Sequence, residues 1–235
     1  MGTPSDIGAR RKPGAAAFSL AAVLMAALLF LAGGCSSAGP EYHHALGAPA
    51  YWDRSRLLAA SPYLPGHALV PVPGQSRSSH LAGLRAGLRV GALFFRDETG
   101  DHFCTASVVV SPAKDLLITA AHCINGGRGS SGYKSDIEFI PDYRNGAAPL
   151  GVWTPAKLLV APQWADSSDP DFDVGFVVLR PNDGRDIQQV LGANRLGTDL
   201  REQYLVHVTG YPDSDGAPIT CVNWTSAFSS TQLRF

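Results

Sequence analysis

The stretch LITAAHC, residues 117–123, contains the most informative pattern in this chain. A short apolar run, typical of a strand, leads into two small residues that present His122 on a turn. Cys123 follows directly, and Cys104 lies upstream in the segment HFCTASVVV at 102–110. An imidazole on a turn suits general acid–base chemistry, because its ordinary pKa is near neutral. The alternative is a buried structural histidine.

The sequence TAAHC in this setting resembles the catalytic-histidine motif of the chymotrypsin-like serine proteases. The resemblance implies that His122 is the base that takes a proton from a serine hydroxyl. It also implies a disulfide between Cys104 and Cys123 that would pin the histidine turn to the preceding strand. In the chain-entropy model, closing a loop of this size is worth about 3 kcal/mol.

The carboxylate that orients the histidine is expected in DPDFDVGFVVLR, residues 169–180. Asp173 stands directly before an apolar strand and resembles the family's D-[IV]-[AG]-x-x-x-L pattern, so we assign it this role. Asp171 would share the same side of an extended chain and is the second candidate. The alternative is that residues 167–173 are simply an acidic turn.

No nucleophile is assigned within the chain. The segment VTGYP at 208–212 resembles an early turn of the second barrel in the bacterial glutamyl-endopeptidase-like branch, whose serine lies in a later G-x-S-G-[GS]-P loop. That loop is not found here. Ser214 follows the turn between two carboxylates, which would oppose oxyanion stabilisation. Ser226, Ser229 and Ser230 lack the flanking glycines. We expect the serine to lie beyond Phe235, so that the chain is C-terminally truncated.

The pattern of short β-branched and aromatic runs separated by turns predicts an all-β fold. With the resemblance, this implies a chymotrypsin-like double β-barrel, the first barrel complete in residues 84–182 and the second incomplete in 183–235. A short helix is expected at 187–191. Strands are expected at 89–95, 103–110, 116–119, 137–140, 152–160 (interrupted by Pro155), 174–179, 204–208, 219–224 and 226–235.

Residues 1–35 have the organisation of an export signal. A basic cluster at 10–12 precedes the apolar run at 15–31, and small residues then lead to Cys35. This resembles a bacterial lipoprotein processing site, with Cys35 as the lipidated residue. An ordinary secretory signal or an uncleaved anchor are the alternatives. All three place the folded part outside the cytoplasm, secreted or anchored to the outer face of the bacterial membrane.

Residues 36–83 are rich in Pro, Ala, Gly and Ser and are expected to form a tether or a pro-segment, in which 51–52 and 57–58 could dock locally. His43 and His44 are a bare pair without further ligands at suitable spacing. A metalloenzyme using these residues or His102 is the weakest interpretation, and we expect neither metal nor cofactor.

The net charge of −1 gives no reason to expect a nucleic-acid partner. The chain has four cysteines. If Cys35 carries lipid and Cys104 pairs with Cys123, then Cys221 is left with a partner beyond Phe235 or as a free thiol. The resulting hypothesis is an exported serine endopeptidase acting on proteins or peptides, with membrane attachment through a lipid. A catalytically inactive, protease-like surface binding protein is the alternative.

Overall fold

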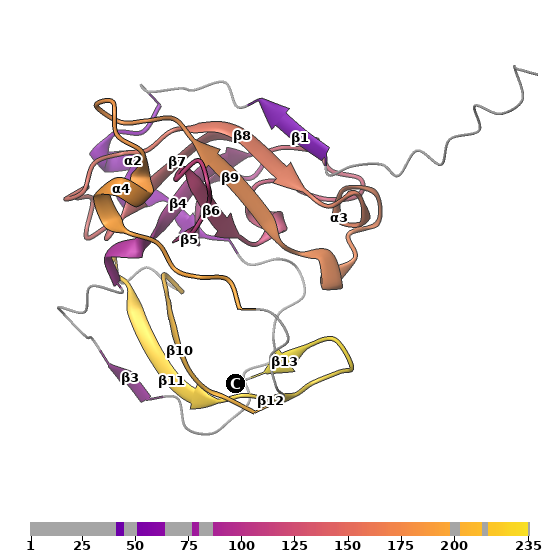
Figure 1. Cartoon of the computed structure of the whole chain (residues 1–235). Helices are drawn as coiled ribbons and strands as arrows, with labels where there is room; N and C mark the ends of the chain where they lie inside the picture. The colour runs from indigo at the N-terminus through magenta and orange to yellow at the C-terminus, as the bar shows by residue number, and fades with distance from the viewer. Residues whose placement is uncertain are drawn as a thin grey trace, which may run out of the picture. The chain divides into compact units, whose positions relative to one another are not determined.

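The structure is a computed structural model that describes residues 41–44, 51–63, 77–79, 87–197, 203–212 and 216–234 (Figure 1). Only the backbone is described for 41–44 and 77–79. All described residues lie in one compact unit, Gly39–Phe235. The expected signal segment, Cys35 and Ser214 lie outside the described residues, as do the side chains of His43 and His44.

An eight-stranded sheet forms the larger part of the fold. Its strands follow the order β1-β8-β9-β6-β5-β4-β7, and the short β2 pairs in parallel with β5 while the other pairs are antiparallel. The bounds are β1 Glu41–His44, β2 Ser61–Pro62, β4 Val90–Asp97, β5 Gly100–Val109, β6 Leu116–Thr119, β7 Ser135–Pro141, β8 Pro155–Val160 and β9 Gly175–Leu179.

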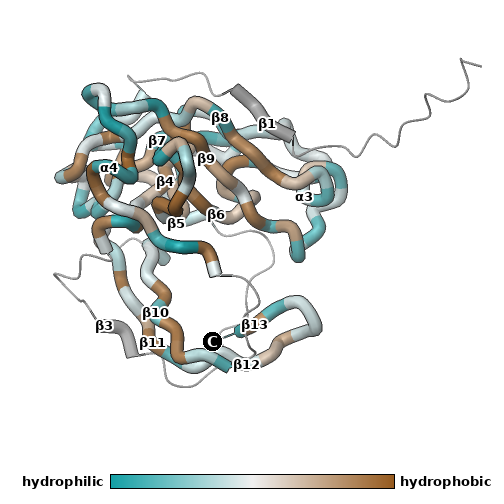
Figure 2. Tube along the Cα trace, in the orientation of Figure 1, coloured by the Kyte–Doolittle hydropathy of each residue, from teal (hydrophilic) through white to brown (hydrophobic). Residues whose placement is uncertain are grey.

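This sheet curls toward a closed barrel. Phe139 in β7 and Trp153, just before β8, exchange two backbone hydrogen bonds of 2.8 and 2.9 Å. The edge strand β7 is thereby joined to the chain that enters β8. Alternate residues of β9, namely Gly175, Val177 and Leu179, are buried, as expected for a strand with one face toward a core. Apolar residues run along β8 and β9 (Figure 2).

The central strand β4 is buried on both faces. Leu93 and Phe95 belong to the main core inside the sheet. Ala92 and Phe94 point the other way, into a second apolar cluster, and all four residues have 0% exposure. The segment at 51–63 contributes to that second cluster through Ala60, with Trp52 and Leu57 packed against it.

A second, three-stranded sheet has the order β10-β11-β3, formed by β3 Arg77–Ser79, β10 Leu205–Gly210 and β11 Ile219–Trp224. The strands β12 Ser226–Ala227 and β13 Leu233–Arg234 form a separate hairpin. Tyr211, at the end of β10, is 5% exposed, and its backbone N–H donates to Thr105 Oγ1 of β5 at 2.8 Å. The all-β, chymotrypsin-like double-barrel class predicted from the sequence is confirmed.

Helices are few and short. They are α2 Arg54–Ala59, α3 Pro162–Ser167 and α4 Ile187–Leu191, with 3₁₀ turns η1 Gly87–Arg89, η2 Ala121–Cys123 and η3 Pro170–Phe172. The expected helix at 187–191 is present, and Asp186 caps it in a capping box with Gln189. Within the described ranges, no helix has both the length and the apolar character needed to cross a bilayer.

Two expected strands differ in detail. Pro155 is the first residue of β8 instead of an interruption within it, a position where its missing N–H removes no interior ladder bond. The expected strand at 226–235 is a hairpin, because the backbone N–H groups of Phe228 and Ser229 turn back to donate to the carbonyl of Gln232.

Candidate active site

The turn that presents His122 begins where β6 ends. The N–H groups of Cys123 and Ile124 donate to the carbonyls of Ala120 and Ala121, which closes η2 as a tight 3₁₀ turn. Thr119, the last residue of β6, donates its hydroxyl to the carbonyl of Thr105 at 2.8 Å. The histidine backbone is therefore fixed by hydrogen bonds on its own turn and on the neighbouring strand.

A disulfide joins this turn to β5. Cys104 and Cys123 are bonded, with their Cα atoms 6.1 Å apart and a sequence separation of 19 residues. The two cysteines are 7% and 2% exposed, so the bond lies within the main core. Cys221, half-buried in β11, is a free cysteine in the described part of the chain.

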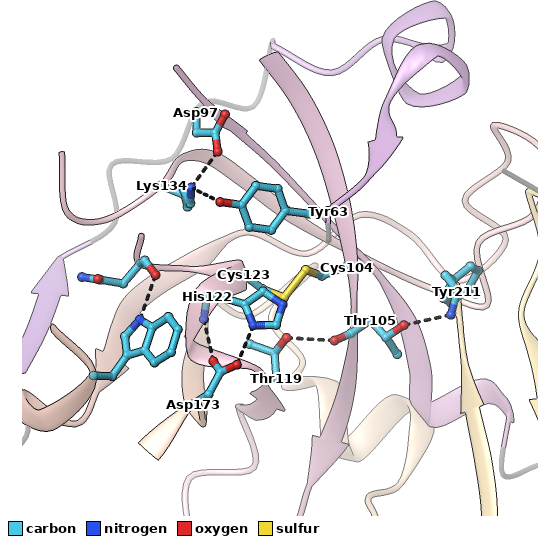
Figure 3. Close-up of a disulfide and its surroundings, with 12 residues drawn as sticks. Tyr63, Asp97, Cys104, Thr105, Thr119, His122, Cys123, Lys134, Asp173 and Tyr211 are labelled. Atoms are coloured by element: carbon cyan, nitrogen blue, oxygen red, sulfur yellow. Dashed lines mark hydrogen bonds and ion pairs between the residues drawn. A yellow bond between two sulfur atoms is a disulfide. The ribbon is translucent and has the colours of Figure 1, made fainter. Parts of the chain in front are cut away.

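The carboxylate of Asp173 binds His122 through both of its oxygens (Figure 3). Oδ2 lies 2.6 Å from the ring Nδ1, and Oδ1 accepts the backbone N–H of His122 at 2.9 Å. Because an ionised carboxylate can only accept, the ring proton is on Nδ1 and Nε2 is left to act as a base. The side chains of His122 and Asp173 are 17% and 25% exposed, so the pair is shielded but reachable.

Burial and hydrogen bonding act in opposite directions on the Asp173 carboxyl. Desolvation raises its pKa, whereas the hydrogen bonds from the ring and the backbone of His122 lower it. The hydrogen bonds outweigh the desolvation, and the pKa lies below its ordinary value. Asp173 therefore stays ionised at neutral pH and can stabilise a positively charged imidazolium.

Two features of the local sequence bring Asp173 to the histidine turn. Asp169 caps η3 by accepting the N–H of Asp171, and the short turn ends at Asp173. Gly175, two residues later, lies against the histidine turn: a Cβ there would lie 2.8 Å from Ile124 Cδ1 and 3.2 Å from the Cα of Ala121. A side chain at 175 would push the start of β9 away from the turn.

Aromatic rings flank the imidazole of His122. The ring of Tyr63 lies 6.0 Å from it between centroids, and the ring of Trp164 lies 6.4 Å from it. Trp164 is 8% exposed and donates its Nε1–H to the carbonyl of Asn125 at 2.9 Å. Neither residue was singled out from the sequence. Trp164 is in α3, and Tyr63 belongs to the proline-rich segment expected to be a tether.

The second carboxylate candidate, Asp171, points elsewhere. Its Oδ1 accepts from Thr231 Oγ1 and Gln232 Nε2, each at 3.0 Å. The carboxyl of Asp171 therefore binds the β12–β13 hairpin, whereas that of Asp173 binds the histidine turn.

Among the described residues, Asp173 is the hydrogen-bond partner of the His122 side chain, and no serine hydroxyl bonds to it. Of the serines considered from the sequence, Ser229 bonds within its own hairpin to the N–H groups of Thr231 and Gln232. Ser226 lies in β12 and Ser230 in the turn that follows.

Metal binding has little support within the described ranges. Cys104, His122 and Cys123 place potential ligand atoms within 4.8 Å of one another, but both sulfurs are committed to the disulfide and are not thiolates. His102 contacts Ser61 Oγ at 2.9 Å through Nδ1 and Thr99 Oγ1 at 2.7 Å through Nε2.

Comparison with known proteins identifies structural neighbours. No family model matches the sequence, and no curated protein matches it. The thermostable serine protease AL20 from an extremophilic microorganism shares 26% identity, with a TM-score of 0.58 over 63% of this chain and 71% of that one. The protease Anisep from Arthrobacter nicotinovorans shares 25% identity, with a TM-score of 0.55 over 63% and 68%.

A Glu endopeptidase is also similar in fold, with a TM-score of 0.57 over 67% of this chain and 72% of that one, at 13% identity. These neighbours are serine proteases, and they support a protease function for the present chain. In its fold and its structural neighbours, the chain is similar to the bacterial chymotrypsin-like serine proteases.

Proposed function

We propose that the protein is an exported serine endopeptidase that hydrolyses peptide bonds with His122 as general base and Asp173 as its orienting carboxylate. The observation that carries the proposal is the two-point contact of Asp173 with the ring and backbone of His122. A single carboxylate thereby fixes both the tautomer and the position of the imidazole, which is what nucleophile activation by a histidine requires.

The reaction follows from this arrangement. Nε2 of His122 removes the proton of a serine hydroxyl as its oxygen attacks the substrate carbonyl, and the imidazolium that forms is stabilised by Asp173. The imidazolium then donates the proton to the departing amine, leaving an acyl-enzyme. Water, deprotonated by the same histidine, releases the acid product and restores the serine.

We assign the nucleophile to sequence that follows Phe235. Support comes from the second sheet, where Leu205 and its cross-strand partner Trp224 share one face and are 52% and 63% exposed in the described part of the chain. Exposed apolar groups of this kind are typical of a face that further chain covers. A serine loop packed there would complete the site.

Export and anchoring are part of the proposal. The basic cluster and apolar run before Cys35 fit a signal segment, with Cys35 as the site of lipid attachment. The disulfide between Cys104 and Cys123 fits an oxidising compartment outside the cytoplasm. The substrates would then be proteins or peptides outside the cell.

The test compares two neighbouring carboxylates in protein expressed from the complete gene. Asp173→Asn should lower kcat on peptide substrates by about 10⁴-fold, because the amide would favour the wrong tautomer of His122. Asp171→Asn is the matched control and should retain activity, since its carboxyl contacts the β12–β13 hairpin.

Equal activity of the wild type and Asp173→Asn would contradict the assignment of the carboxylate. A folded wild type with no hydrolytic activity on any peptide would favour the alternative, a protease-like surface binding protein.

A further inference from the structure

The segment Tyr51–Tyr63 forms regular structure and pairs with the barrel, which is not expected of a removable leader or a loose tether. Its α2 helix is capped by Asp53, whose side chain accepts the N–H of Arg56 at 2.9 Å. At its end, β2 adds to β5 in parallel, and the N–H of Tyr63 donates to the carbonyl of Phe103 at 3.0 Å. The segment is therefore an ordered addition to the first barrel, paired with residues 102–103 of β5.

The segment covers buried residues of the barrel. Phe94 has 0% exposure on the outer face of β4, where Trp52 packs against it with ring centroids 5.3 Å apart. Tyr143 donates its hydroxyl to the carbonyl of Leu57 at 3.1 Å, and Trp52 Nε1 donates to the carbonyl of Asp136. Loss of the segment would expose an apolar barrel face and leave these polar groups without partners.

The segment ends beside the proposed base (Figure 3). The ring of Tyr63 lies 6.0 Å from that of His122 and 5.2 Å from those of Phe95 and His102. Aromatic pairs at these separations attract and restrict each other's rotation. Tyr63 is thus held by two rings of the barrel while it covers one side of the imidazole.

A buried ion pair holds Tyr63 from the other end. Lys134 Nζ lies 3.2 Å from the Tyr63 hydroxyl and 2.6 Å from Asp97 Oδ2. The side chains of Lys134 and Asp97 are each 8% exposed, and the N–H of Lys134 donates to the carbonyl of Ile124 beside the histidine turn. Asp97 compensates the ammonium charge, so the contact orients Tyr63 without placing an unpaired cation near His122.

We propose that Tyr51–Tyr63 is a retained part of the catalytic unit and that Tyr63 is a positioning residue, which holds the imidazole of His122 in the orientation set by Asp173. This inference rests on the proposed function. The inference extends the proposed function by assigning a role to a segment that precedes the barrel. In this role the Lys134–Asp97 pair holds Tyr63 in place. A site is accurate only when the residues around its reacting groups are themselves held in place.

The first measurement is the imidazole Nδ1–H resonance of His122 in protein labelled with ¹⁵N-histidine. Tyr63→Ala should broaden or abolish this resonance through faster exchange. Tyr63→Phe keeps the ring and its contact with Lys134 Nζ, 4.6 Å from the ring centroid, but loses the hydroxyl hydrogen bond, so it should restore the resonance in part. Leu58→Ala, at a 54% exposed position of α2, is the matched control and should leave the resonance unchanged. This measurement needs no hydrolytic activity. It can therefore test the role of Tyr63 even if the protein proves not to be a protease.

The second measurement is kinetic, on protein from the complete gene. Tyr63→Ala should lower kcat about 10-fold or more with KM little changed, because a misplaced base affects the chemical step. If Tyr63→Ala does not fold, Tyr63→Leu replaces it, since leucine keeps apolar volume but not the flat ring. An unchanged resonance and kcat in the folded variant, or no rescue by Tyr63→Phe, would overturn the positioning role.

Peptide mapping of the active protein recovered from the culture medium tests retention of the segment. The peptide that contains residues 51–63 should be present in stoichiometric amount. Fully active protein that lacks this peptide would overturn the inference.

Discussion

Asp173 binds His122 twice, at the ring and at the backbone. Comparison with Asp171 shows that position in the chain, more than residue type, decides which carboxyl contacts His122. Asp171 has the same carboxyl group two residues earlier, yet it faces the β12–β13 hairpin, because a 3₁₀ turn separates the two instead of an extended strand. The sequence motif favoured Asp173, whose carboxyl contacts His122, although extended-chain geometry alone left both residues open.

A buried acid elsewhere in the barrel gives a residue-scale prediction on pH. Glu138 in β7 is 5% exposed, and desolvation, with repulsion from Asp136, raises its pKa to about 7 from the ordinary 4.5. The native state therefore holds this proton more tightly than the unfolded state. The stability that follows is fully present below about pH 4.5 and is lost as the pH rises through about 7.

We expect Glu138→Gln to remove this dependence. At pH 8 the variant should be more stable than the wild type by up to about 3 kcal/mol, the limit set by the two pKa values at about 1.4 kcal/mol per unit. At pH 4 the two proteins should be equally stable. Urea unfolding at both pH values measures this, with Glu98→Gln as the exposed control. An equal difference at pH 4 and pH 8 would show that the carboxyl does not titrate in this range.

At the scale of elements, the link between the histidine turn and β5 depends on the disulfide. Replacing both Cys104 and Cys123 by alanine should lower the free energy of unfolding by about 3 kcal/mol, because the unfolded chain regains the freedom of the closed loop. Cys221→Ala, made in residues 1–235, is the control and should have a small effect, since Cys221 forms no disulfide among the described residues. Urea unfolding under oxidising conditions is the measurement. Coincident unfolding curves for the double variant and the wild type would contradict the predicted stabilisation by the disulfide.

Elements with a strong local pattern were predictable from the sequence. The strand at 116–119 and the helix at 187–191 have the predicted bounds, because a short apolar run in the first and a capping box in the second are local signals. The contacts of residues 51–63 are made with a barrel surface that lies far away in the sequence. The composition of the segment itself therefore does not predict them. A usable signal lay in β4, whose unbroken apolar run at 90–95 indicates burial on both faces.

The same reasoning explains which parts of the site could be found. His122, Cys123 and Asp173 lie in short motifs with fixed order and register, so the sequence could propose them as candidates. Tyr63, Lys134 and Asp97 come from three separate segments that meet only after the barrel has folded. Their residue types are ordinary, and their spacing in the chain carries no information about the contact.

For the whole molecule, the described second sheet is attached to the first barrel at Tyr211, which bonds Thr105 through its N–H and the carbonyl of Tyr143 through its hydroxyl. The histidine and the aspartate both come from the first barrel. In the proposed reaction the nucleophile must come from the other side of the site. The proposed reaction therefore requires a serine, supplied by sequence after Phe235, to meet Nε2 of His122.

Covalent labelling with a fluorophosphonate tests this most directly. Protein from the complete gene is treated with the reagent, digested and analysed by mass spectrometry, in the wild type and in His122→Ala. The account predicts one adduct, on a serine outside residues 1–235, in the wild type and its loss in His122→Ala. No adduct on the folded wild type, or an adduct on a serine within residues 1–235, would contradict it.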